Sequence, residues 1–366
     1  MRILHVVPSF GLGGMEKIIC AIINNTVDCY THDILALDQQ TDAQRWLKEK
    51  PIPVIDFKKP NSQRAFFSDL YHFLRKTMPD LLMTYNWGAT DAVWLGRAAG
   101  IRRVIHSEHG FNVDEVNATN WKRDAARSLV YRLASKVVVV SRELQTLLGR
   151  RYLLKATQVK RIPNGIDVSY YSADLTDRNQ TRKRLGFSEP DVVIGFSGRL
   201  DPVKNLDRLL NIFASCFRQE SHFRLLIVGD GPERKRLENL SREKSVQGYV
   251  VFTGQQEEVV SYVRAMDVFL QTSLREQMPM SVLEAMAVGV PVVATEVGEI
   301  PYLIDHGIDG FILEVDAPIE AYVRTLFALL SRPERARVGE AGRRKIVDHF
   351  EEKRMVQQYK TVIQAI

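Results

Sequence analysis

The chain contains ILHVVPSFGLGGMEKII at residues 3–19 and VVIGFSGRLDPVKNLDRLLNIF at residues 192–213. Both stretches have the same layout: a short apolar strand, a turn that contains glycine, and then a helical pattern. Strand–turn–helix units of this kind build parallel sheets, and ligands bind beyond the carboxyl ends of their strands. The repeated layout predicts an α/β protein with two Rossmann-like domains that face each other across a cleft.

The rest of the chain continues the pattern, because short apolar strands alternate with helical stretches in both halves. In the first half we predict strands over 3–8, 33–37, 53–55, 81–84, 103–106, 136–140 and 159–162. In the second half we predict them over 192–196, 224–228, 250–252, 268–271, 290–294 and 311–313. The final stretch, 319–366, is predicted to be mostly helical.

A polar, charge-rich stretch over 172–190 separates the two halves and has the composition of a connection between domains. We therefore predict an N-terminal Rossmann-like domain over 1–170 that takes an acceptor, a linker over 171–190, and a C-terminal domain over 191–345. A terminal helix over 346–366 is expected to pack back on the N-terminal domain.

The bulk composition fits two soluble domains, since 366 residues with 45% hydrophobic content are enough for two cores. No apolar run approaches the ~20 residues that span a bilayer, and the N-terminal run is too short for a signal peptide. The three cysteines show no metal or redox spacing, which favours the cytoplasm. The net charge of +6 permits contact with polyphosphates or anionic lipid but is too small to indicate nucleic-acid binding.

Residues 272–301, TSLREQMPMSVLEAMAVGVPVVATEVGEIP, place two carboxylates near a predicted helix over 281–288. Glu276 precedes the helix, and Glu284 lies one turn inside it. A helix N-terminus attracts anions, and a carboxylate accepts hydrogen bonds from a pair of hydroxyl groups. The spacing therefore predicts a pocket for a sugar or ribose next to a phosphate.

Two basic residues, Arg199 and Lys204, follow the first strand of the second half. A guanidinium and an ammonium group can bind a diphosphate and replace the metal ion that often neutralises it. The alternative is a solvated surface pair. Gly254 follows another strand, where its backbone is expected to contact a nucleotide base.

The first half offers Gly13 and Gly14, whose backbone N–H groups can approach a phosphate, although a plain strand-to-helix turn is the alternative. His109 follows a strand in the sequence IHSEHGF. With His106 and Glu108 it suggests a metal cluster, but no third histidine or cysteine stands nearby. We favour His109 as a residue that binds a sugar hydroxyl or stabilises charge, and His106 as a structural residue.

The turns over 163–167 and 228–232 fit plain turn chemistry, and the second of them can also border a nucleotide. The stretch 120–136 is a basic helix. It either packs on its domain as an ordinary amphipathic helix or lies on an anionic membrane surface.

These motifs together resemble the family 4 retaining glycosyltransferases, which have the GT-B fold. The resemblance rests on Glu276 and Glu284, on the run over 285–294, on GRL followed by KN over 198–205, on GGxE over 13–16 and on PNGID over 163–167. It covers nearly the whole chain. The segment 107–122 resembles, more narrowly, sugar transferases of exopolysaccharide and PEP-CTERM/exosortase gene clusters.

The resemblance implies a role for each matching residue. Arg199 and Lys204 would bind the donor diphosphate, Glu284 the ribose hydroxyls, and Glu276 and His109 the donor sugar. Gly13 and Gly14 would approach phosphate or acceptor. The chain departs from the family at Gln277, where glycine is common, but backbone N–H groups remain at Met278, Met280 and Ser281.

The predicted activity is therefore the metal-independent, retaining transfer of a sugar from a nucleoside diphosphate sugar, with UDP favoured over GDP. No cofactor is expected. The acceptor would be a saccharide or a lipid-linked saccharide in cell-surface glycan synthesis, and the protein would be cytoplasmic or peripheral at the inner membrane. The alternatives are a nucleotide-sugar epimerase on the same fold and a non-catalytic nucleotide-sugar sensor.

Overall fold

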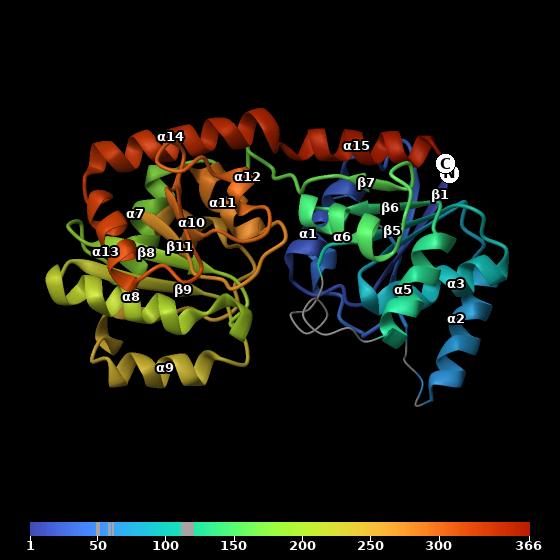
Figure 1. Cartoon of the computed structure of the whole chain (residues 1–366), viewed down its shortest axis with the longest axis horizontal. Helices are drawn as coiled ribbons and strands as arrows, with labels where there is room; N and C mark the ends of the chain where they lie inside the picture. The colour runs from blue at the N-terminus through green and yellow to red at the C-terminus, as the bar shows by residue number, and fades with distance from the viewer. Residues whose placement is uncertain (49–51, 58–59, 61, 111–120) are drawn as a thin grey trace. The chain divides into compact units, whose positions relative to one another are not determined.

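The computed structural model describes residues 1–48, 52–57, 60, 62–110 and 121–366. The chain forms two compact units, each built around one parallel sheet (Figure 1). Unit 1 comprises Met1–Gly165 and Lys353–Ile366, and unit 2 comprises Ile166–Glu352.

The sheet of unit 1 has seven strands in the order β3-β2-β1-β4-β5-β6-β7. Their bounds are β1 Arg2–Val7, β2 Thr31–Ala36, β3 Val54–Asp56, β4 Leu81–Tyr85, β5 Val104–Glu108, β6 Lys136–Val139 and β7 Val159–Arg161. All the neighbouring pairs are parallel. Strands β1, β2 and β4 are almost wholly buried, as expected for strands covered on both faces.

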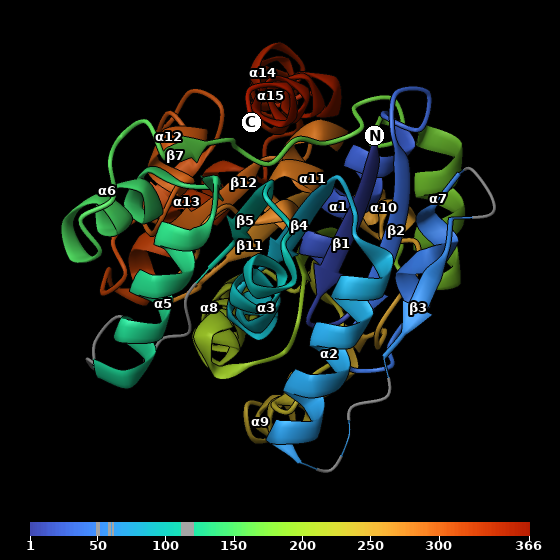
Figure 2. The same cartoon turned by 90° about the vertical axis from the view of Figure 1, so that its right-hand side faces the viewer.

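The helices of unit 1 are α1 Gly14–Asn24, α2 Gln63–Thr77, α3 Thr90–Ala99, α5 Trp121–Leu133, α6 Arg142–Arg151 and α15 Glu352–Gln364. Helices α2, α3 and α5 lie side by side along the sheet (Figure 2). Side chains at the helix starts explain where two of them begin. The hydroxyl groups of Ser62 and Ser141 accept backbone N–H groups at the starts of α2 and α6.

The sheet of unit 2 has six strands in the order β10-β9-β8-β11-β12-β13, again with parallel neighbours. The strands are β8 Val192–Ser197, β9 Phe223–Val228, β10 Val250–Phe252, β11 Val268–Gln271, β12 Val292–Thr295 and β13 Phe311–Leu313. The helices are α7 Leu175–Arg184, α8 Leu206–Gln219, α9 Arg234–Glu243, α10 Val260–Ala265, α11 Met280–Val288, α12 Ile300–Leu303, α13 Ile319–Ala328 and α14 Arg332–His349.

One hydrophobic core of unit 2 lies between the sheet and helices α8 and α13. Every second residue of β8 and β9 contributes to it, and so does one face of α8, because a strand and a helix bury residues with periods of 2 and 3.6. The thirteen predicted strands are all present within a few residues of their predicted bounds, which confirms the predicted class of two parallel-sheet domains.

The ends of the units differ from the boundaries that composition suggested. The expected linker, 171–190, contains the helix α7 and belongs to unit 2, because Asp174 caps this helix and its arginines bond to residues before β11. The terminal helical stretch divides between α14 in unit 2 and Lys353–Ile366 in unit 1. None of the described helices is long and apolar enough to cross a membrane.

Candidate functional site: the strand ends of the two sheets

In unit 2, the candidate residues follow neighbouring strands of one parallel sheet. Gly254 comes after β10, Gly229 after β9, the basic loop 198–204 after β8, and the acidic loop 272–279 after β11. Since all the strands run the same way, these loops meet at one edge of the sheet. This edge is where an open parallel sheet binds its ligand.

Two glycines allow the loops at this edge to touch. Gly229 has φ +137°, and a Cβ atom there would lie 1.9 Å from the carbonyl oxygen of Gly198. Gly298 has φ +59°, and its Cβ atom would lie 1.8 Å from the carbonyl oxygen of Glu276. The backbone of Gly229 also donates to the carbonyl of Gly254 at 2.9 Å. Packing therefore accounts for Gly229 by itself, as the plain-turn interpretation predicted.

Glu276 is the polar centre of this edge. Its Oε1 atom accepts three hydrogen bonds, from Lys204 Nζ at 2.7 Å, from Gln271 Nε2 at 2.6 Å and from Ser273 Oγ at 2.7 Å. Its Oε2 atom accepts none from the described residues. The hydrogen bonds thus fix one oxygen of this buried carboxyl group and leave the other oxygen available to a ligand.

The two predicted basic residues have different surroundings. The ammonium group of Lys204 pairs with Glu276, and the side chains are 20% and 8% exposed. Because an ammonium group has three donors, this pairing leaves Lys204 able to bind a phosphate as well. Arg199 is exposed, and its side chain makes no hydrogen bond or ion pair with the described residues. The structure thus joins Lys204 to the acidic loop and leaves Arg199 at the surface.

Glu284 lies in the second turn of α11 and is buried. The hydroxyl group of Tyr171 donates to its Oε1 atom at 3.0 Å. Burial, together with the charge of Glu284, raises the pKa of Tyr171 well above its ordinary value, so the phenol stays protonated as a donor. The sequence analysis missed Tyr171, and it also missed Gln271 and Ser273, because no short motif links them to the glutamates.

The loop before α11 presents the start of a helix. Pro279 is the cap residue, and no side chain caps α11, so the first N–H groups at Met280 and Ser281 have no partner within the helix. Met278 is buried just before them. Gln277, which replaces the glycine common in the family, is also buried, and its carbonyl accepts the N–H group of Glu299.

In unit 1, the glycine turn lies between β1 and α1. Gly13 caps α1 in an extended conformation, and Glu16 in the first turn is buried. Burial raises the pKa of Glu16 to about 7, and the nearby Asp38 adds to the effect. The Glu16 side chain lies against Gly13, since a Cβ atom at Gly13 would be 2.3 Å from Glu16 Oε2. A side chain at position 13 would therefore displace the Glu16 carboxyl group.

His109 follows β5, and its backbone N–H group donates to Asn86 Oδ1 at 2.7 Å. Burial lowers the pKa of His109 to about 4, so the ring is neutral at pH 7. Its Nε2 atom is buried without a hydrogen-bond partner among the described residues. A neutral ring with an unpartnered nitrogen can hydrogen-bond a hydroxyl group, so the predicted role of His109 stays a prediction.

Asn86 was missed by the sequence analysis, although it connects the two parts of this edge. Its Nδ2 atom donates to Met15 Sδ in α1 at 3.3 Å, while its Oδ1 atom holds the backbone of His109. Its backbone has φ +53° and ψ 177°, a conformation that is costly for a residue with a side chain. Strain of this kind is typical of functional sites, but no sequence pattern indicates it.

His106 is fully buried within β5, as predicted for a structural residue, and its Nδ1 atom bonds to Thr84 Oγ1 at 2.8 Å. Glu108 is also buried and accepts the Tyr131 hydroxyl at 2.7 Å. In the part of the chain that the structure describes, no group of His, Cys, Asp or Glu side chains has the arrangement of a metal site.

The predicted basic helix is present as α5. Its buried residues are Val130, Tyr131 and Arg127, and the Arg127 guanidinium lies 5.0 Å from the centre of the Trp87 ring. Leu129 is 55% exposed, and Trp121 is 72% exposed.

Comparison with known proteins assigns this architecture to a class. Solved structures that hold UDP, and solved structures of glycosyltransferases, superimpose over 99–100% of this chain. One is Anabaena HepE in complex with UDP-glucose, which is 22% identical, covers 100% of both chains and gives a TM-score of 0.85. The fold is therefore the GT-B fold, two Rossmann-like domains with parallel sheets.

The sequence matches two family models, "Glycosyltransferase Family 4" over residues 12–170 and "Glycosyl transferases group 1" over residues 177–345. The GDP-mannose-dependent alpha-(1-6)-phosphatidylinositol monomannoside mannosyltransferase of Mycolicibacterium smegmatis is 30% identical over 70% of this chain and 69% of its own length. The N-acetyl-alpha-D-glucosaminyl L-malate synthase of Bacillus anthracis is 30% identical over 56% of this chain, which spans only 53% of that relative. The chain belongs to the family 4 glycosyltransferases.

Proposed function

We propose that the protein is a retaining, metal-independent glycosyltransferase that uses a nucleoside diphosphate sugar. The observation that carries the proposal is the group formed by Lys204, Glu276 and the uncapped start of α11. It puts a cation and backbone N–H donors beside a carboxylate with one available oxygen. A donor with a diphosphate and a hydroxyl-rich sugar needs both kinds of group.

The proposed chemistry is a departure of the nucleoside diphosphate assisted by Lys204 and Arg199. Their positive charges stabilise the negative charge that grows on the leaving phosphate as the C1–O bond breaks. The acceptor hydroxyl attacks C1 from the side that the phosphate leaves and gives its proton to a phosphate oxygen. This sequence retains the configuration at C1 and needs neither a protein nucleophile nor a metal ion.

Glu276 and Glu284 position the donor in this proposal. Glu276 Oε2 accepts a hydroxyl group of the sugar, and Glu284 accepts the ribose hydroxyls beside the Tyr171 hydroxyl. We favour UDP over GDP as the nucleotide because the solved HepE complex carries UDP-glucose. The mannosyltransferase of Mycolicibacterium smegmatis is instead named as GDP-mannose-dependent, so the donor base is the first point to test.

We further propose a saccharide or lipid-linked acceptor in cell-surface glycan synthesis, of the exopolysaccharide type that the segment 107–122 resembles. Most of that segment lies outside the described residues. The exposed Trp121 and Leu129 of α5, together with Lys122 and Arg123, fit contact with an anionic membrane surface. The protein would then act in the cytoplasm, at the inner face of the membrane.

Donor binding is tested by thermal shift with UDP, GDP and their sugar conjugates, without metal, on the wild type and on Glu284→Ala. Saturation at about 100 times Kd adds about 2.7 kcal/mol, a shift of a few degrees. A shift with one nucleotide series that Glu284→Ala loses and the exposed control Glu296→Ala keeps would support the proposal. The absence of any shift would contradict it.

Membrane contact has its own test, sedimentation with vesicles that contain anionic lipid. We expect the wild type to bind and the double variant Trp121→Ser, Leu129→Ser to bind weakly. Leu175→Ser in unit 2 replaces a residue of similar exposure, 74%, and is expected to change nothing. Equal binding by all three proteins would remove α5 from the proposal.

A further inference from the structure

Unit 2 has a second polar site, at the opposite edge of its sheet from Glu276. A cavity of about 600 Å³ opens at the amino ends of β8 and β11, a volume within the range of small-molecule pockets. The six residues of β8 separate it from the loop that follows this strand by roughly 20 Å. It is lined by five basic side chains, Arg178, Arg182, Lys183, Arg332 and Arg335, and three acidic ones, Glu189, Asp191 and Asp267. We call it the basic cavity.

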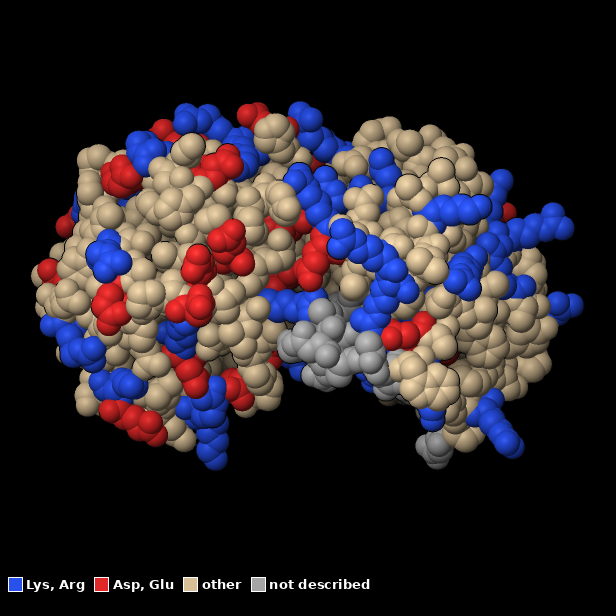
Figure 3. Space-filling view, viewed as in Figure 1, with Lys and Arg blue, Asp and Glu red and all other residues tan. Residues whose placement is uncertain are grey.

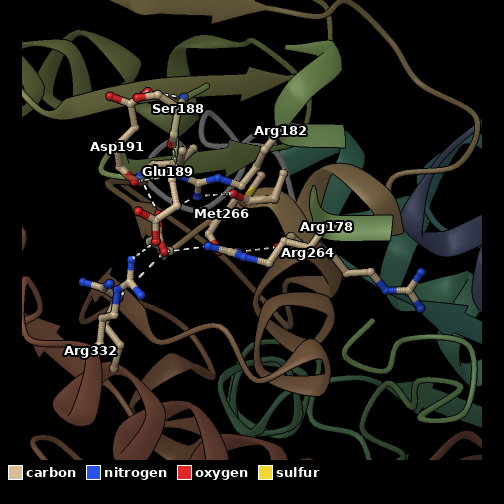
Figure 4. Close-up of polar contacts among 12 residues, drawn as sticks. Arg178, Arg182, Ser188, Glu189, Asp191, Arg264, Met266 and Arg332 are labelled. Carbon is tan, nitrogen blue, oxygen red and sulfur yellow. Dashed lines mark hydrogen bonds and ion pairs between the residues drawn. The ribbon is translucent and has the colours of Figure 1, made fainter. Parts of the chain in front are cut away.

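Asp267 lines the basic cavity and pairs with several arginines at once. Arg178 Nη2 donates to Oδ1 at 2.7 Å, Arg182 Nη1 donates to Oδ2 at 2.8 Å, and Arg335 Nε lies 3.8 Å from Oδ1. Figure 4 shows Arg178 and Arg182 together with Arg332, which also lines the cavity. Burial opposes ionisation of Asp267, yet the nearby charges of Arg178 and Arg182 lower its pKa below the ordinary value. One negative charge therefore faces three buried or half-buried positive charges.

The two other acidic residues of the basic cavity do not neutralise this excess of positive charge. Asp191 Oδ1 already pairs with Arg224 at 2.9 Å, and its Oδ2 atom accepts the backbone and hydroxyl of Ser188. Glu189 pairs with Arg332 at 2.7 Å, but both side chains are mostly exposed, so the pair is weak. Lys183 makes no side-chain hydrogen bond or ion pair among the described residues.

The start of a helix adds positive potential at the basic cavity. The 18-residue helix α14 begins at Arg332, with no side-chain hydrogen bond to cap it, so its N-terminal end faces the same place. Burial lowers the pKa of Arg178 and of Arg335, and neighbouring arginines lower both further. Unit 2 as a whole has 23 Lys and Arg against 29 Asp and Glu, so its net charge is negative although basic residues predominate around the cavity.

We propose that the basic cavity binds a phosphorylated small molecule with at least two negative charges, at a site separate from the donor site. The excess of guanidinium groups around Asp267 supplies the fixed positive charge, and Lys183 and Arg332 supply movable cations at the rim. The phosphate can belong to a soluble metabolite or to a lipid headgroup. The site does not depend on the proposed transfer reaction.

The test is calorimetric titration of the full chain with inorganic pyrophosphate, without metal, on two double variants. Arg199→Gln with Lys204→Gln removes the basic residues of the proposed donor site. Lys183→Gln with Arg332→Gln removes the rim of the basic cavity but keeps the buried arginines that hold α7. Lys235→Gln with Arg242→Gln, on the exposed helix α9, is the matched control for charge.

We expect the donor-site variant and the control to retain a pyrophosphate site. Adding the two rim changes to the donor-site variant should abolish this binding or weaken it about tenfold. Binding that this combined variant keeps at full affinity, or that the donor-site variant alone loses completely, would overturn the proposal. Vesicles with and without an anionic phospholipid distinguish the sources. Vesicle binding that requires the rim residues assigns a lipid headgroup, and pyrophosphate binding without it assigns a soluble ligand.

Discussion

The two units of this chain have the same kind of sheet but opposite charge. Unit 1 has 27 Lys and Arg against 15 Asp and Glu, a formal charge of +12, and unit 2 has 23 against 29, a formal charge of −6. On the face shown in Figure 3, basic side chains predominate over unit 1, whereas both signs mix over unit 2. The field of unit 1 can therefore attract an anionic partner, while unit 2 must bind anions through individual basic groups.

The surroundings of the buried ionisable groups also differ between the two units. In unit 2, the charges of Arg178 and Arg182 lower the pKa of the buried Asp267. Glu276 is buried beside the ammonium group of Lys204. In unit 1, burial moves the pKa values of Glu16 and His109 toward the neutral forms. Burial likewise lowers the pKa values of His5 and His32, which form a buried hydrogen-bonded pair. The difference teaches that strand ends of the same topology can hold either fixed charges or neutral hydrogen-bonding groups.

The largest expected effect is on stability, when the carboxylate shared by the arginines of unit 2 is removed. Asp267→Asn leaves Arg178, Arg182 and Arg335 without their shared carboxylate, so we expect the free energy of unfolding to fall by about 4 kcal/mol. Urea denaturation measures this fall. The control Asp348→Asn, at an exposed site in α14, should stay within about 0.5 kcal/mol of the wild type. Equal stabilities of the two variants would contradict the pairing described for unit 2.

The next prediction concerns unit 1, where the buried carboxyl group of Glu16 makes stability depend on pH. Its pKa is about 7 in the folded chain and near 4.5 in the unfolded chain, so folding takes up a proton between these values. Stability from this group is present at pH 4.5 and is lost as the pH rises through 7, a loss of about 3 kcal/mol. Glu16→Gln should remove this loss and be more stable than the wild type at pH 8.

The measurement for Glu16 is urea denaturation at pH 5 and pH 8. Asp28→Asn, at an exposed site in unit 1, is the matched control and should keep the dependence on pH of the wild type. If the free energy of unfolding of Glu16→Gln depended on pH in the same way as that of Asp28→Asn, burial would not raise the pKa of Glu16.

A third effect concerns the function of the paired charges. Lys204→Ala removes the cation beside Glu276 and should lower kcat for sugar transfer by about 10²-fold, or about 3 kcal/mol, as for the loss of one donor to a developing anion. Lys235→Ala removes an exposed lysine and should leave kcat unchanged. A full transfer rate in a folded Lys204→Ala protein would mean that this lysine only holds Glu276 in place.

The smallest effect concerns Tyr171. Tyr171→Phe removes one hydrogen bond to Glu284, a change of about 1 kcal/mol, so KM for the donor should rise about fivefold with kcat nearly unchanged. Tyr170→Phe alters the neighbouring, more exposed phenol and is the control. A rise in KM of the same size in both variants would show that Glu284 does not need this particular partner.

Local patterns predicted much of this protein. Runs of Val, Ile and Leu such as 192–194 and 225–228 gave the strands, because a fully buried strand needs apolar side chains on both faces. The spacing of Glu276 and Glu284 was sufficient to put one before α11 and the other inside it. The polar stretch 171–190 was predicted as a linker, but its Arg178 and Arg182 are not solvated and bond to Asp267 and to backbone carbonyls.

The sequence by itself determined the fold class, the family and the segments that carry the candidate site. Only the tertiary structure paired Lys204 with Glu276, 72 residues away, and Tyr171 with Glu284, 113 residues away. It alone placed Asn86 between α1 and His109 and gathered arginines from α7 and α14 around Asp267. The physical reason is that periodicity and turn chemistry act between near neighbours, whereas hydrogen-bond partners and desolvation depend on which distant segments the packed sheet brings together.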